Sequence, residues 1–346
     1  MTTGQKVTVF GAYGHTGRFV VAELLERGFT PVLSGRDAEK LTALADTFPD
    51  HPGLDVRPAS ADDPEALDRA LAGVDAVVNC AGPFASTASG LIEAALRARV
   101  PYVDVAAEIE ANADTFAHYS ARAAEAGSLI VPAMAFFGGL GDLLVTAAMG
   151  DWTSADEAHV AYALSSWHPT AGTRGAGAVS RERREGRRVV FSGGRLRHRD
   201  DAPPTLTWSF PDPVGDRSVI GEFTMADVVT VPSHLAVPEV RTYMTTEAAR
   251  DVVAPDSPAP TAVDERGRSA QTFLVDVVVR SGGQERRATA SGRDIYAVTA
   301  PLAVEAVHRV LTGRTEAVGV VSAGAAFDAA DFLHALAAHV SVDLGR

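Results

Sequence analysis

A glycine-spaced segment near the start of the chain constrains its fold most. Gly11, Gly14 and Gly17, in GAYGHTG, stand between an apolar β-branched run at residues 7–10 and an amphipathic helical pattern. Glycine allows a sharp exit from a strand, a close approach of backbone N–H groups to a phosphate, and tight packing of helix on strand. This order predicts a βα unit whose turn holds the pyrophosphate of a dinucleotide at the positive end of the helix.

The same alternation of strand and helix continues through about residue 140. Further apolar runs stand at residues 31–34, 76–79, 102–105 and 129–131. Helical patterns separate them, and Asp37 and Asp63 are placed to cap two of these helices. Repeated βα units of this kind predict an α/β fold with a doubly wound parallel sheet of the Rossmann type.

Beyond residue 155 the pattern changes to alternating polar and apolar residues. Strands are expected at residues 159–164, 188–191, 205–210, 227–231, 240–245 and 272–279, with a helix at 172–184. Helical patterns return at 300–311 and 328–339. We therefore expect a Rossmann domain at 1–143, an inserted α/β domain with a mixed or antiparallel sheet at 144–292, and C-terminal helices at 293–346 that pack back on the first domain.

The end of the second predicted strand bears on cofactor choice. Sites for NAD carry an acid there that accepts a hydrogen bond from the ribose 2′-hydroxyl, whereas this strand ends Ser34-Gly35-Arg36. A guanidinium makes bidentate contacts to a 2′-phosphate, so NADP is the expected cofactor. Asp37 could approach the ribose instead, although its position suits a helix cap better. Expected cofactor contacts from these segments are Gly11, Tyr13, Gly14, His15, Thr16, Gly17, Ser34 and Arg36.

The charge and the cysteine content limit the classes of partner and cofactor that the chain can bind. Thirty-one basic against 44 acidic residues give a formal net charge of −13, which repels nucleic acid and anionic membranes. The single cysteine, Cys80, excludes an intramolecular disulfide and a CxxC metal or redox site. Neither a leader-like start nor an apolar run of about 18 residues is present. We expect a cytoplasmic protein with a small-molecule substrate, without a bound metal and without nucleic-acid or membrane partners.

Several segments, in this order, resemble the saccharopine dehydrogenase-like NADP-dependent reductases. They are GAYGHTG, SGRDAEKL, VVNCAGPF, YVDVAAE, AGSLIVPAMAFFGGLGDLL, PTAGTRGAG, VVTVPSHLAVPEVRTYM and GRDIYAVTAP. The resemblance implies an N-terminal NADP domain, an inserted domain, and a cleft between them where nicotinamide meets substrate. It also implies a homodimer formed through the second domain.

Residues that end or follow the strand at 76–79 are expected to contact the nicotinamide end of the cofactor. Asn79, Gly82 and Pro83 end or follow the strand at 76–79, at the carboxyl edge where ligands bind in open α/β sheets. The substrate side is assigned to Phe136, Trp167, Thr173 and Arg174. Of these, Thr173 and Arg174 begin a predicted helix and could bind an anionic group.

Three residues are candidates for proton transfer. Asp104 and Glu108 flank the end of the strand at 102–105, and His168 stands in the loop before the second domain's first helix. Imidazole titrates near neutral pH, which favours His168 as a proton donor. For all three residues, the alternative is a purely structural role. Asp142 follows two glycines and precedes an apolar helical run, and we expect it to cap that helix.

These residues predict an NADPH-dependent oxidoreductase that reduces a C=N, C=O or activated C=C bond of a small metabolite. None of the tyrosines is followed by lysine at Tyr-x-x-x-Lys spacing, so the short-chain dehydrogenase mechanism is excluded. Two alternatives stay open. One is a protein that binds NADP as a sensor or scaffold without catalysis, and the other is a trans-acting enoyl reductase for a carrier-bound chain.

Overall fold

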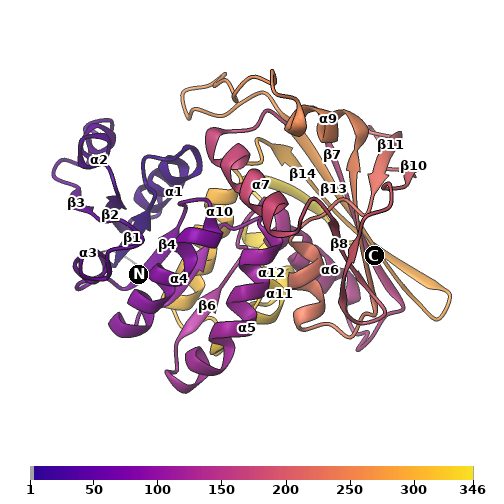
Figure 1. Cartoon of the computed structure of the whole chain (residues 1–346), viewed down its shortest axis with the longest axis horizontal. Coiled ribbons are helices and arrows are strands. Elements are labelled where there is room, and N and C mark those ends of the chain that lie inside the picture. Colours follow the sequence, from indigo (N-terminus) through magenta and orange to yellow (C-terminus); the bar gives the residue numbers. More distant parts are fainter. Residues whose placement is uncertain (1–3, 346) are drawn as a thin grey trace.

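The structure is a computed structural model that describes residues 4–345, and two β-sheets with helices between and around them build it (Figure 1). In the described part of the chain, the first sheet has seven strands, all parallel. Their order is β15 (Gly319–Val320), β6 (Leu129–Val131), β5 (Tyr102–Asp104), β4 (Ala76–Asn79), β1 (Lys6–Phe10), β2 (Thr30–Gly35) and β3 (Asp55–Pro58). This is the doubly wound α/β sheet that the sequence predicts.

The helices of this part follow their strands as expected. They are α1 (His15–Glu26), α2 (Ala38–Ala45), α3 (Pro64–Ala70), α4 (Phe84–Ala98) and α5 (Ile109–Glu125). The carboxylates of Asp37 and Asp63 accept hydrogen bonds from the first-turn backbone of α2 and α3, which confirms both predicted caps. The chain order reverses at β1, which pairs with β2 on one side and β4 on the other. Ligands of open α/β sheets bind outside the carboxyl ends of strands at such a point.

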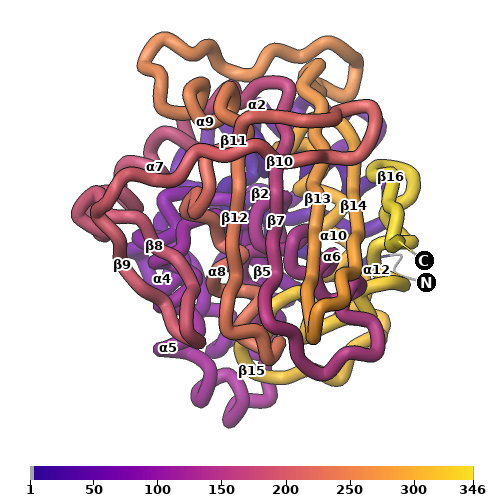
Figure 2. Tube along the Cα trace, turned by 90° about the vertical axis from the view of Figure 1, so that its right-hand side faces the viewer, coloured from indigo at the N-terminus to yellow at the C-terminus, as the bar shows by residue number. Residues whose placement is uncertain are grey.

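The second sheet is mixed, and Figure 2 shows its central strands face-on with the first sheet behind. Along its main path the order is β10 (Thr205–Ser209), β11 (Asp216–Gly221), β12 (Glu239–Thr245), β7 (Glu157–Leu164), β13 (Thr272–Ser281), β14 (Gln284–Arg293) and β16 (Val340–Asp343). Off this path, β8 (Arg188–Ser192) pairs with β12 and with β9 (Leu196–Arg199). Strands β7 and β12 are parallel, and the other pairs are antiparallel.

The remaining helices connect the sheets or cover them. They are α6 (Gly141–Met149), α7 (Ala171–Arg183), α8 (Asp227–Thr230), α9 (Thr246–Val253), α10 (Thr299–Leu311), α11 (Ala323–Ala326) and α12 (Ala329–Ala335), with irregular turns η1 (Phe136–Leu140) and η2 (Val231–Ser233). Helix α6 packs against β13 and β14, and α10 packs against α1, β4 and β5. One apolar core therefore continues from β1 through these helices to β13.

Two sequence expectations are wrong in this region. Residues 227–231 were expected to form a strand, but they form helical turns in α8 and η2. A short buried apolar run does not distinguish a strand from a buried helical turn, and Pro232 within η2 cannot continue a strand ladder. The tail after residue 293 contains strands as well as helices, because β15 joins the first sheet and β16 joins the second.

The proposed division of the chain at residues 143 and 292 remains a prediction. Within residues 4–345, none of the helices has the length and apolar character needed to cross a membrane.

Candidate functional site

The glycine loop between β1 and α1 tolerates no side chain at two of its positions. Gly11 has a φ of +83°, and a Cβ there would lie 2.8 Å from the backbone nitrogen of Ala81. At Gly17 a Cβ would clash with the carbonyl oxygen of Gly11 and lie 2.8 Å from that of Ala12. The backbone N–H groups of Gly11 and Ala12 donate to the carbonyl of Ser34 at 2.8 and 3.1 Å. The loop is therefore held between the end of β2 and the turn that follows β4.

The amino terminus of α1 is open to an anion. Gly14 is the capping residue, no side chain caps the helix, and no acid stands in its first turn. The first N–H groups of a helix lack partners within it, and the helix dipole is positive at this end. His15 and Thr16 supply two of these groups. This geometry fits a pyrophosphate bound by backbone amides.

Beyond the end of β2, the side chains fit a phosphorylated ribose. Arg36 is exposed and forms no ion pair with any acid within residues 4–345. Asp37 is already engaged, because its carboxylate accepts from the Lys40 backbone N–H at 3.1 Å and pairs with its ammonium at 3.1 Å. The Lys40 ammonium lies 5.7 Å from the centre of the Tyr13 ring. Two cations and an aromatic ring are therefore present near the end of β2, where the 2′-phosphate is expected.

Asn79 and Asp104 are buried at the carboxyl ends of β4 and β5. The Asp104 carboxylate accepts from the backbone N–H groups of Ala106 and Ala133 at 3.0 and 2.8 Å, and from the Tyr102 hydroxyl at 2.9 Å. The same hydroxyl accepts from the Asn79 amide at 3.0 Å. Burial raises the pKa of Asp104 to about 6. These contacts favour a structural role for Asp104, which ties the ends of β5 and β6 together.

Glu108 caps a neighbouring helix. Its carboxylate accepts from the backbone N–H groups of Phe84 and Ala85, at 2.6 and 3.2 Å, at the start of α4. Burial raises its pKa. The Pro83 carbonyl accepts from the Ser86 N–H in the same turn. Burial also raises the pKa of the Cys80 thiol, which disfavours a thiolate nucleophile there.

Helix α7 brings the second part of the chain over this edge of the first sheet. A Cβ at Gly82 would lie 3.9 Å from that of Ala176 in α7. Thr170 caps α7, with its hydroxyl accepting from the Thr173 N–H at 3.0 Å. The nicotinamide-end and substrate-side residues thus come from opposite walls of one junction.

Tyr296, which follows β14, links the two walls and was not predicted as a site residue. Its ring lies 5.1 Å from the ring of His15 in the glycine loop. Its hydroxyl donates to the carbonyl of His168 at 3.1 Å and lies 3.1 Å from the Thr173 hydroxyl. Its only sequence signal is its place in GRDIYAVTAP, directly after a long strand. Tyr296 therefore positions the His168 loop over the glycine loop.

The four residues assigned to the substrate divide into two kinds. Trp167 lies near this junction, 4.9 Å from the Phe137 ring, and is 6% exposed. Phe136 is 1% exposed and packs on Tyr162 and Phe273 in the core. Arg174 donates to the carbonyls of Ala254 and Ser257 at 3.2 and 2.6 Å, so its guanidinium holds a loop. Trp167 and Thr173 are therefore the two that stand at the junction.

A buried acidic cluster lies beneath Phe136. Asp227 is fully buried and accepts from the Tyr162 hydroxyl at 2.8 Å, and burial raises its pKa to about 7. Asp142 was expected to cap α6, which is wrong, because the cap is Leu140. Instead its carboxylate lies 2.8 Å from His234 Nε2 and accepts from the Gly324 N–H at 2.7 Å. It joins α6 to the tail rather than to its own first turn.

The raised pKa of Asp227 predicts a pH effect on stability. Its ordinary value is 3.8, so between about pH 4 and 7 the folded chain keeps a proton that the unfolded chain releases. This contribution to stability is complete below that window and is lost as the pH rises through 7. Relative to wild type, Asp227→Asn should gain on the order of 2–4 kcal/mol of unfolding free energy from pH 4.5 to 8. Urea unfolding at both pH values measures this, and a pH-independent difference would contradict it.

Comparison with known proteins agrees with this geometry. Residues 7–131 match the family model described as the saccharopine dehydrogenase NADP binding domain. The chain is 33% identical over 142 residues to a probable mitochondrial saccharopine dehydrogenase-like oxidoreductase of Arabidopsis thaliana. That match covers 38% of this chain and 31% of the relative, so it spans about a third of the relative's length.

The structure also matches a solved protein over nearly its whole length. Apo saccharopine dehydrogenase (L-Glu forming) from Saccharomyces cerevisiae aligns with a TM-score of 0.64 at 11% identity, covering 98% of this chain and 99% of the other. At this identity the match shows a shared fold. Residues 7–131 of this chain thus match the saccharopine dehydrogenase NADP binding domain, and the whole chain has a fold like that of saccharopine dehydrogenase.

Proposed function

We propose that the chain is an NADPH-dependent reductase that acts on a C=N, C=O or activated C=C bond of a small metabolite. The observation that carries the proposal is the uncapped amino terminus of α1 facing Tyr296 and the α7 junction. The nicotinamide supplies the hydride when NADPH is bound. The chain's own residues would bind the diphosphate through the amides of His15 and Thr16 and the 2′-phosphate through Arg36.

The proton that accompanies the hydride is assigned to His168. Asp104 has hydrogen-bond partners on both carboxylate oxygens, and Glu108 caps α4 with both of its oxygens. His168 is half-buried, and its backbone is fixed by the Tyr296 hydroxyl at 3.1 Å. General acid catalysis by a positioned imidazole contributes roughly 10²–10⁴-fold.

His168→Asn should therefore lower kcat by about 10²-fold or more with little change in the Kd for NADPH. Steady-state kinetics on any accepted substrate, with NADPH binding measured by nucleotide fluorescence, check this. Glu108→Gln is the matched comparison, because we expect it to lower the unfolding temperature while kcat stays within about threefold. A kcat loss for Glu108→Gln with wild-type stability and none for His168→Asn would reassign the proton donor.

The decisive test of the reaction is turnover. Purified chain with NADPH should oxidise the nucleotide in the presence of at least one member of a panel of imines, ketones and enones, followed at the absorbance of the reduced nicotinamide. The structural engagement of Asp104 and Glu108 favours, as the second candidate, an NADP-binding sensor or scaffold. Tight NADPH binding without turnover on the whole panel would support that second candidate.

A further inference from the structure

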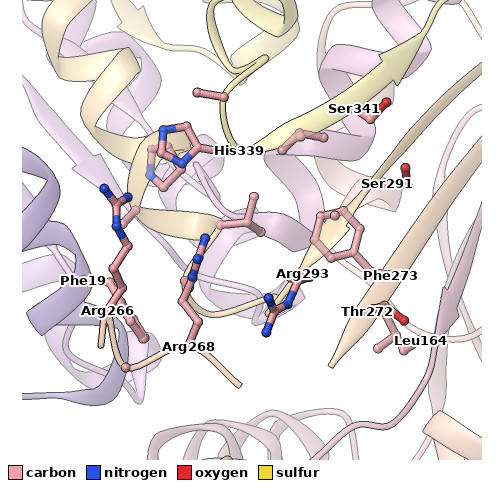
Figure 3. Close-up of a pocket in the computed structure, with 18 of the residues that line it drawn as sticks. Phe19, Leu164, Arg266, Arg268, Thr272, Phe273, Ser291, Arg293, His339 and Ser341 are labelled. Atoms are coloured by element: carbon pink, nitrogen blue, oxygen red, sulfur yellow. The ribbon is translucent and has the colours of Figure 1, made fainter. Parts of the chain in front are cut away.

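A large cleft lies away from the expected nicotinamide end. It runs from α1 and α2 to the edge of the second sheet at β13, β14 and β16, and has a volume of about 1760 Å³ (Figure 3). Sites for small molecules usually measure about 300–1,000 Å³. Its described lining includes nothing from the carboxyl ends of β4, β5 and β6. The cleft is therefore separate from the proposed nicotinamide end, although it adjoins the expected 2′-phosphate position, because Tyr13 and Lys40 line it.

The lining is apolar over several elements of both sheet layers. Contributors include Phe19 and Leu44 from the first part of the chain, Leu164 and Phe273 from the second, and Pro301 and Val340 from the tail. Figure 3 shows Leu164 and Phe273 together on the second-sheet side and Phe19 across from them. Phe19, Leu164, Phe273 and Val340 are each 9% exposed or less, so a ligand with an apolar body would contact only the parts of these side chains that face the cleft.

Arginine side chains line one side of the same cleft. Arg266 and Arg268 come from the segment before β13, and Arg293 ends β14 (Figure 3). Arg266 pairs with Glu26 at 3.4 Å, and Arg268 pairs with Asp264 at 2.9 Å.

Arg293 forms no ion pair with an acid of residues 4–345, and its guanidinium makes one long bond, 3.4 Å, to the Ser269 carbonyl. A guanidinium has five N–H donors, so Arg268 and Arg293 both retain donors for an anion. Acids also line the cleft, namely Glu23, Glu26, Asp212, Glu247, Glu265 and Asp343. Of these, Glu23 pairs with Arg27 at 2.7 Å. Lysine and arginine side chains balance the acids in this lining, whereas the whole chain has a net charge of −13.

We propose that this cleft binds a molecule with a single apolar chain and an anionic end group. The chain would lie along Phe19, Leu44 and Phe273, and the anion would accept hydrogen bonds from Arg268 and Arg293. Because both sheet layers line the cleft, the ligand would contact both at once. The anion is either a carboxylate, as in a free fatty acid, or a phosphate ester.

Titration calorimetry of the full chain with decyl phosphate, decanoate, decanol and inorganic phosphate tests the proposal. At least one of the two anionic amphiphiles should bind about tenfold or more tightly than decanol and than inorganic phosphate. Preference between decanoate and decyl phosphate identifies the source of the anion. Affinity for decanol equal to that for both amphiphiles, or no binding of any probe, would overturn the proposal.

Substitutions locate the binding in this cleft. Arg268→Gln with Arg293→Gln should weaken the amphiphile by about 10- to 100-fold through the loss of charge-assisted contacts, and Arg293→Gln alone by about 3- to 10-fold. Leu44→Gln should weaken the amphiphile and decanol alike. The matched control is Arg69→Gln on α3, whose side chain is 68% exposed and does not line the cleft.

Each variant is first checked for wild-type NADPH affinity and unfolding temperature. The single variant Arg293→Gln keeps the test valid if loss of the Arg268–Asp264 pair unfolds its loop. Amphiphile affinity unchanged in Arg293→Gln, or reduced equally by Arg69→Gln, would overturn the assignment to this cleft.

Discussion

Gly17→Ala is expected to abolish measurable NADPH binding. A Cβ at this position would clash with the carbonyl oxygen of Gly11 and lie 2.8 Å from the carbonyl oxygen of Ala12. Both are backbone atoms of the loop that we propose holds the pyrophosphate, so α1 must move away from the loop to admit the methyl group. We expect a stability loss of about 1–3 kcal/mol and an affinity loss of at least about 100-fold.

Nucleotide fluorescence and thermal unfolding measure the two effects separately. Gly177→Ala in α7 is the matched control, because a Cβ there meets no heavy atom within 4 Å. That substitution should leave NADPH affinity unchanged and raise helix stability by roughly 0.5–1 kcal/mol. Wild-type affinity in Gly17→Ala would show that the amides of this turn do not bind the diphosphate.

Arg36→Ala should change cofactor selectivity rather than general affinity. Loss of a charge-assisted bidentate contact to the 2′-phosphate costs about 1–3 kcal/mol, so the Kd for NADPH should rise about 10- to 100-fold. The Kd for NADH should stay within about twofold, since NADH lacks this phosphate. The difference should shrink at high ionic strength because the contact is solvent-exposed.

Lys40→Gln provides a second test of the same 2′-phosphate assignment. It removes the ammonium that pairs with Asp37 at 3.1 Å and frees this carboxylate to repel a phosphate. We expect a smaller loss for NADPH, about threefold to tenfold, again without loss for NADH. Equal losses for both nucleotides in Arg36→Ala would refute the 2′-phosphate assignment.

Local sequence patterns predicted most of the first half of the fold, because most of its elements carry their own signal, although β3 (Asp55–Pro58) was not predicted. The strand runs are short and β-branched, Asp37 and Asp63 begin their helices, and the glycine spacing marks the turn. The helical turns at residues 227–233 gave no such signal. Their apolar residues are buried between layers, and periodicity over so few positions does not separate strand from helix.

The sequence predicted the part of the site that depends on backbone conformation, the glycine loop. It did not predict which polar side chains are already engaged in hydrogen bonds with the protein. The glycine loop needs particular residues at particular positions, so its pattern is readable. Asp104 and Glu108 are acids at the right edge of the sheet, but only the structure shows their hydrogen bonds to backbone N–H groups. Tyr296 lies 281 positions after His15 in the chain, and no local pattern predicts that their rings lie 5.1 Å apart.

The pairing of the tail with both sheets bears on how the chain folds during synthesis. Strand β15 adds to β6 of the first sheet, and β16 adds to β14 of the second. The parallel sheet therefore keeps an open edge beside β6 until residues 319–320 have left the ribosome, long after its other strands. Such unpaired edges invite aggregation, so the nascent protein depends on late-arriving residues, or on a chaperone, to close its first sheet.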